Sequence, residues 1–152
     1  MEGDRMKLDL KTTVRTDIET FWQKLKTPTS LQFVAAPVIY FDRINDVTFG
    51  EDWKEGETYF LPMQYFGRIP AGVQSVTMMT IDDESKTIVT DESGGAAKRW
   101  IHTMQLRSTG NGTVEYHDTL EIEAGIKTPF LWLFVQLFYR HRQRRWKKLL
   151  GS

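Results

Sequence analysis

The sequence predicts an α+β fold in which a curved, seven-stranded antiparallel sheet wraps around one long C-terminal helix. Three observations carry this prediction: a helical segment of unusual length ends the chain, strand-like segments precede it, and two short helices follow the first strand. As a helix, the segment from Pro129 to Leu150 would be roughly 33 Å long at about 1.5 Å per residue. A sheet with one solvated face buries its other face against a helix, and this is the only helix long enough to cover it.

The first part of the chain predicts one strand and two short helices. Alternating apolar and polar residues indicate a strand over about residues 6–14. A capping-box pattern beginning at Thr16 then predicts a helix over about residues 17–26. A second short helix, capped by Ser30, is expected from Leu31 to Ala35, with a proline on either side to bound it.

The middle of the chain is strand-like throughout. Its segments are rich in Val, Thr, Tyr and Met, and turn-forming clusters of Gly, Asp, Asn and Ser separate them. Further strands are therefore predicted over residues 38–41, 58–65, 73–81, 87–91, 99–107 and 113–123. The sequence shows no internal repeat, low-complexity tract or linker, so a single domain over residues 1–152 is expected.

The last helix, expected over about residues 129–150, changes character halfway along. Thr128 suits its N-cap and Pro129 suits its first turn. The first half is apolar all round, whereas the second half is strongly basic, and cations near a helix C-terminus complement the helix dipole. The cations of the second half are Arg140, Arg142, Arg144, Arg145, Lys147 and Lys148.

The composition is that of an ordinary soluble protein and excludes several classes. The chain has 152 residues with a formal net charge of +0, and it contains no cysteine, which excludes disulfides and thiolate chemistry. The start of the chain lacks the apolar segment of a secretory signal, so a cytoplasmic location is expected. The three histidines lack metal-ligand spacing and no nucleotide-binding loop is present, so neither a metal nor a cofactor is expected.

The order of elements resembles the helix-grip fold of the START-like superfamily, which includes the polyketide cyclase/dehydrase and lipid-transport group and the relatives of the birch pollen allergen. Several local motifs resemble a bacterial subgroup of this superfamily. They are Gly67-x-Ile69-Pro70, Trp100-x-His102, Tyr116-x-Asp118 and Tyr139-Arg140-x-Arg142-Gln143-x-x-Trp146. The resemblance implies a small hydrophobic or lipid-like ligand between the sheet and the long helix. It implies no reaction, because members of the superfamily share no catalytic motif.

His102 and Asp118 are the sharpest candidate pair. Both lie on apolar faces of adjacent predicted strands, so both are expected to point inward. A loop centred on Gly110 would place His102 directly opposite Asp118. One interpretation is a general base, with His102 oriented by Asp118 and Tyr116 serving as the acid of a cyclase/dehydratase-type enzyme. The alternative is a buried polar pair in which each partner satisfies the other inside the sheet.

Arg142 is the second candidate, because it is the one charge on the apolar stripe of the last helix. A charge that faces a core needs a partner, and Asp118, Glu92 or a ligand carboxylate could serve. Alternatively, the aliphatic stem packs and the guanidinium reaches water. The expected ligand-binding residues are Trp100, His102, Met104, Tyr116, Asp118, Leu131, Val135, Phe138 and Arg142.

The opposite face of the last helix suggests a different kind of partner. Phe130, Leu133 and Leu137 form an apolar patch there, and basic residues continue the same face. Such a face could rest on an anionic membrane as a peripheral contact, dock another protein, or be covered by loops or by the second subunit of a homodimer. A sequence pI of 6.8 argues against nucleic acid as a partner, since nucleic-acid-binding domains are usually basic.

Overall fold

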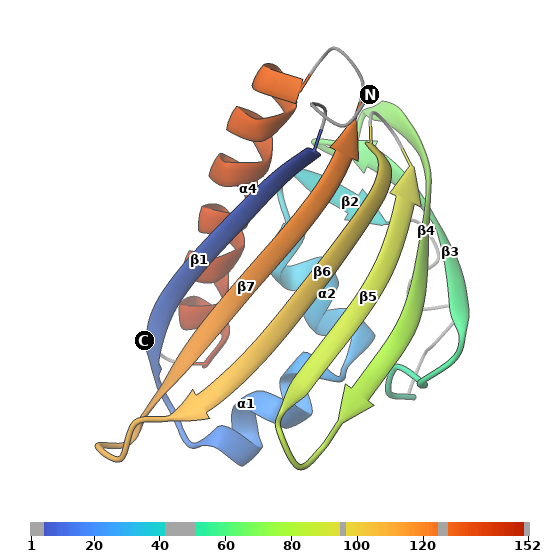
Figure 1. Ribbon diagram of the computed structural model, residues 1–152. Helices are drawn as coiled ribbons and strands as arrows, with labels where there is room; N and C mark the ends of the chain where they lie inside the picture. Colours follow the sequence, from blue (N-terminus) through green and yellow to red (C-terminus); the bar gives the residue numbers. More distant parts are fainter. Residues whose placement is uncertain (1–4, 42–50, 95–96, 125–127, 151–152) are drawn as a thin grey trace.

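A computed structural model describes residues 5–41, 51–94, 97–124 and 128–150 of the chain. It confirms the predicted architecture, a seven-stranded antiparallel sheet with strand order β1-β7-β6-β5-β4-β3-β2 (Figure 1). The strands are β1 (Arg5–Arg15), β2 (Ile39–Phe41), β3 (Thr58–Tyr65), β4 (Ile69–Asp82), β5 (Thr87–Gly94), β6 (Ala97–Ser108) and β7 (Thr113–Ala124). The helices are α1 (Ile18–Leu25), α2 (Pro28–Ala35) and α4 (Thr128–Leu150).

The sheet curls around α4, which packs mainly against β1 and α2 (Figure 1). Four irregularities interrupt the strand pairing, one in each of the β3–β4, β4–β5, β5–β6 and β6–β7 ladders. Such bulges bend a strand and increase its twist. The β1–β7 and β2–β3 ladders at the two edges of the sheet are regular.

Both short helices begin at positions other than those predicted. The N-cap of α1 is Asp17 rather than Thr16, and its carboxylate accepts a hydrogen bond of 2.8 Å from the backbone N–H of Thr20. The predicted cap Ser30 lies inside α2, which begins at Pro28 with Thr27 as its N-cap. Proline fits the first turn of a helix because its missing N–H needs no partner there, so Pro28 starts this helix instead of interrupting the chain.

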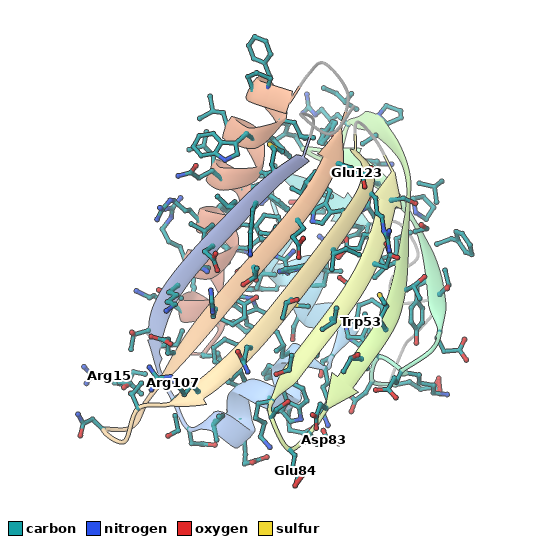
Figure 2. All side chains as sticks on the ribbon, in the orientation of Figure 1. Arg15, Trp53, Asp83, Glu84, Arg107 and Glu123 are labelled. Carbon is teal, nitrogen blue, oxygen red and sulfur yellow. The ribbon has the colours of Figure 1, made fainter. Side chains whose placement is uncertain are left out.

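The side chain of Trp22 anchors α1 to the turn between β4 and β5. Its indole N–H donates to Asp83 Oδ1 at 2.6 Å, and Lys26 Nζ lies 3.1 Å from the same oxygen. Asp83 is labelled on this turn in Figure 2. This contact closes one end of the space between the sheet and the helices.

The core has two apolar parts, one at each end of α4. Phe21 and Trp22 of α1 pack with Trp146 at the C-terminal end of α4. Val135 and Phe138, in the first half of α4, pack with residues of β1 and β7. Among the described helices, none combines the length and the hydropathy needed to cross a bilayer.

Candidate ligand-binding site

A cavity of about 120 Å³ lies between α4 and the inner face of the sheet. It is reached by side chains of β2–β6 and of all three described helices, which fill the space inside the curled sheet (Figure 2). Most of its lining is apolar, and this composition suits the body of a hydrophobic ligand. The apolar and aromatic lining residues are Leu25, Leu31, Ile39, Phe41, Trp53, Met63, Tyr65, Val76, Met78, Ile88, Trp100, Met104, Leu131, Phe134, Phe138, Tyr139 and Trp146.

Glu92 of β5 is the acidic side chain on the sheet side of the cavity, which we call the sheet wall. Its Oε1 accepts a hydrogen bond from Gln74 Nε2 at 3.1 Å, and its Oε2 accepts one from Thr90 Oγ1 at 2.6 Å. His102 Nδ1 is 3.9 Å from Oε2, too far for a hydrogen bond. Each carboxylate oxygen of Glu92 therefore accepts one hydrogen bond, one from the neighbouring strand β4 and one from its own strand β5. Within the described residues, no three metal-binding side chains gather at one point.

Arg142 is the basic side chain on the α4 side of the cavity, which we call the helix wall. Arg142 is only 6% exposed, and its guanidinium carbon lies 4.7 Å from the centre of the Tyr139 ring. Its Nε has no hydrogen-bond partner, and no carboxylate of the described chain lies within 4.0 Å of the guanidinium. Burial by itself would lower the pKa of Arg142, but the acidic groups of Tyr139, Tyr116, Asp118 and Glu92 raise it above its usual value. The group is therefore a buried cation without a contacting counter-ion.

Asp118 lies on β7, outside the cavity lining, and its carboxylate accepts all the hydrogen bonds of a buried network. Its Oδ1 accepts from His102 Nε2 at 2.6 Å and from the Tyr116 hydroxyl at 2.7 Å. Its Oδ2 accepts from Gln143 Nε2 at 3.0 Å. Burial would raise the pKa of Asp118, but the hydrogen bond from His102, the charges of His102 and Arg142 and the hydrogen bond from Tyr116 together lower it. Asp118 is therefore an ionised carboxylate, and because it can only accept, His102 Nε2 carries the proton.

The tyrosine hydroxyls that border this network stay protonated. Burial and the neighbouring charge of Asp118 raise the pKa of Tyr116 well above its ordinary value. Burial likewise raises the pKa of Tyr139. The nearby Trp100 indole N–H partly opposes the rise in the pKa of Tyr139, although it forms no well-aligned hydrogen bond.

The structure brings His102 and Asp118 together, but not in the predicted register. His102 lies opposite Leu120, and Asp118 lies opposite Met104, so the two are diagonal neighbours. The loop is centred on Asn111 rather than Gly110, because both Gly110 and Gly112 take a positive φ and so both belong to the turn. The shift is two residues, which keeps both side chains on the inner face, and the diagonal spacing is within reach of long side chains.

The cavity contains six of the nine residues expected to line it. Trp100, His102, Met104, Leu131, Phe138 and Arg142 border it. Tyr116, Asp118 and Val135 lie outside the lining of this cavity. Asp118 and Tyr116 are 0% exposed, since Gln143 of α4 covers the carboxylate. Val135 packs into the apolar cluster against β1 and β7.

Sequence reasoning missed Gln74, Thr90 and Tyr139 as polar lining residues, and it considered Glu92 only as a partner of Arg142. The sequence of β5 contained a signal for Thr90 and Glu92. Ile88, Thr90 and Glu92 alternate along β5 and border the cavity together. A period of two along a strand places such residues on one face, so the inward direction of Ile88 implies that of Thr90 and Glu92.

Many solved structures have the same architecture, and the three described below are distant from this chain in sequence. Protein CV1439 from Chromobacterium violaceum superposes with a TM-score of 0.72 at 12% identity, covering 97% of this chain and 99% of that one. Norcoclaurine synthase from Thalictrum flavum, in complex with dopamine and hydroxybenzaldehyde, gives 0.67 at 11% identity over 95% and 86% of the chains. Major latex-like protein 151 from Panax ginseng gives 0.68 at 16% identity over 97% and 99%.

These structures establish the fold of the chain as START-like, as the order of its elements indicated. A comparison with curated protein sequences finds no significant match. A protein family described as "Domain of unknown function (DUF8410)" matches residues 12–150, which is nearly the whole chain. The chain therefore belongs to this family.

Proposed function

We propose that the protein binds a small hydrophobic ligand in the cavity between the sheet and α4. The observation that carries the proposal is the cavity itself, in which an apolar lining surrounds a few polar groups on opposite walls. This combination is typical of ligand sites, where apolar side chains bury the ligand and polar groups orient it. The structural neighbours support the same reading, since one of them is in complex with two small aromatic molecules. A cytoplasmic location, expected from the sequence, belongs to this proposal.

Native mass spectrometry of protein purified without detergent tests the proposal. We expect an adduct that disappears on denaturation, and extraction of the denatured sample would identify its chemical class. A clean apo mass, together with no adduct after incubation with octanoate, octanol and octylamine, would contradict ligand binding.

A cyclase/dehydratase-type enzyme would need His102 to reach a substrate. His102 borders the cavity, but Tyr139 packs edge-on against its ring at a centroid distance of 5.0 Å and only 1% of the residue is exposed. Asp118 and Tyr116, its proposed partners, are closed off behind the wall. The geometry favours a structural role for all three side chains. Conversion of a bound ligand by the wild-type protein, lost in His102→Asn, would reverse this conclusion.

A second candidate function uses the back face of α4, by which we mean Phe130, Leu133, Leu137, Arg140, Arg144 and Lys148. The apolar members are open to solvent, with exposures of 82% for Phe130, 52% for Leu133 and 59% for Leu137. Apolar residues followed by cations on one helix face suit an anionic membrane surface. Flotation with vesicles containing phosphatidylserine at low salt tests this idea. We expect binding that Leu133→Glu abolishes, and no flotation of the wild type would dispose of the idea.

A further inference from the structure

The helix wall of the cavity carries two hydrogen-bond donors that nothing in the described chain satisfies. Arg142 Nε and Trp146 Nε1 of α4 are buried without partners, and both residues border the cavity. Arg142 is 6% exposed and Trp146 is 2% exposed, so bulk water does not reach them freely. Guanidinium and indole groups can only donate, which means that each one lacks an acceptor. Buried polar groups are normally paired, so two unpaired donors on one wall need an explanation.

The carboxylates nearest to the cavity do not supply these acceptors. Asp118 accepts hydrogen bonds from His102, Tyr116 and Gln143 and is itself fully buried. Glu92 is held on the opposite wall, where Gln74 and Thr90 bond one oxygen each. Neither lies within 4.0 Å of the Arg142 guanidinium. The unpaired donors therefore need a hydrogen-bond acceptor from outside the protein. At Arg142 this acceptor should be negatively charged, because the guanidinium is a cation.

We propose that the ligand is an apolar carboxylic acid, bound as its carboxylate, whose head group contacts the Arg142 guanidinium. This inference rests on the proposed ligand-binding function. A carboxylate matches the paired donors of a guanidinium in shape as well as in charge. The apolar tail lies among the aliphatic and aromatic side chains of the cavity, for example Ile88, Met104 and Leu131.

Glu92 sets the orientation of such a ligand. It is the acidic residue of the cavity lining, and it lies on the sheet wall, away from the helix wall that carries Arg142. Like charges repel, so Glu92 disfavours a carboxylate beside β5 and directs it toward α4. An amine head group would prefer the opposite arrangement, in which it competes with Gln74 and Thr90 for the oxygens of Glu92.

Isothermal titration with octanoate, octanol and octylamine tests the head group, because these probes share one apolar chain. Near neutral pH, where the acid is ionised, we expect octanoate to bind at least about tenfold more tightly than octanol. Arg142→Gln should weaken octanoate binding much more than octanol binding and so remove this advantage. Arg144→Gln, on the exposed side of the same helix, is the matched control and should keep it. Glu92→Gln should tighten octanoate binding about threefold.

The possible results separate the inference from the proposed function. Equal binding of octanoate and octanol, or a preference for the acid that survives in Arg142→Gln, would overturn the inference and leave ligand binding intact. Failure of all three probes to bind would overturn both. Arg142→Lys, which keeps the charge but loses the planar fork, should retain part of the preference. That variant preserves the test if Arg142→Gln does not fold.

Discussion

His102 and Asp118 form a 2.6 Å hydrogen bond across β6 and β7, although neither lies directly opposite the other. The contact joins β6 and β7 at a point where α4 covers them, since Gln143 donates to the same carboxylate. A second His–Asp pair has the same length on the outer face, between His117 of β7 and Asp9 of β1. One protein therefore offers a buried and an exposed version of the same contact.

Asp118→Asn should be strongly destabilising. The amide keeps one acceptor oxygen, but its NH2 group would face either Gln143 or the pair His102 and Tyr116, which all donate to the present carboxylate. We expect a loss of about 3 kcal/mol in the free energy of unfolding, measured by urea denaturation. Asp9→Asn, which alters the exposed pair, should cost less than about 1 kcal/mol. Equal losses of unfolding free energy in the two variants would show that the buried network stabilises the protein no more than the exposed pair does.

The same carboxylate should make stability depend on pH in the acid range. The pKa of Asp118 is lower in the folded protein than in the unfolded chain, so the unfolded chain binds its proton first. Its contribution is present above its unfolded pKa of about 3.9 and is lost as the pH falls through the folded value. The stability difference between the wild type and Asp118→Asn should therefore shrink as the pH falls below about 4. Other aspartates cancel in this difference, and a constant difference down to pH ~2 would contradict the shift.

Filling the cavity from the first turn of α4 should block the ligand. Leu131 borders the cavity, so Leu131→Trp should weaken binding of octanoate at least about tenfold while leaving the fold intact. Leu133, two residues along, is 52% exposed on the back face, and Leu133→Trp is the control that should bind normally. Titration calorimetry compares the two. Equal binding by both variants would place the ligand elsewhere.

Arg142→Met should cost the ligand-free protein little stability. Methionine keeps the aliphatic stem in place, and the guanidinium that it removes has no contacting counter-ion. We expect a loss below about 2 kcal/mol, whereas losing one partner of a buried ion pair costs roughly 3–5 kcal/mol. Thermal and urea unfolding measure the change. A loss in the larger range would show that Arg142 is satisfied within the protein itself, against the inferred role of a ligand carboxylate.

Periodicity in the sequence was sufficient to predict the elements and their inward faces. The stripe through Leu131, Phe138 and Arg142 lies inward as expected, and so do His102 and Asp118. Periodicity could not fix the register, because a shift of two residues preserves every inward face. The turn residues held that information, since Gly110 and Gly112 both need a positive φ.

The division between core and cavity was also beyond the sequence. Val135 and Phe138 share one stripe of α4, yet Phe138 borders the cavity and Val135 packs against β1 and β7. The difference depends on how far the sheet bends away from the helix. That bend involves the irregularities in the four ladders from β3 to β7, whose positions no local sequence pattern predicted.

Methionine methyl resonances provide the most direct test of the central claim, that a hydrophobic ligand occupies this cavity. Met63, Met78 and Met104 border the cavity, whereas Met79 is 49% exposed on the other face of β4. In a protein labelled at its methionine methyl groups, titration with octanoate should shift the first three resonances and leave that of Met79 in place. Shifts confined to Met79, or no shift of the three cavity methyl groups at saturating octanoate, would contradict the account.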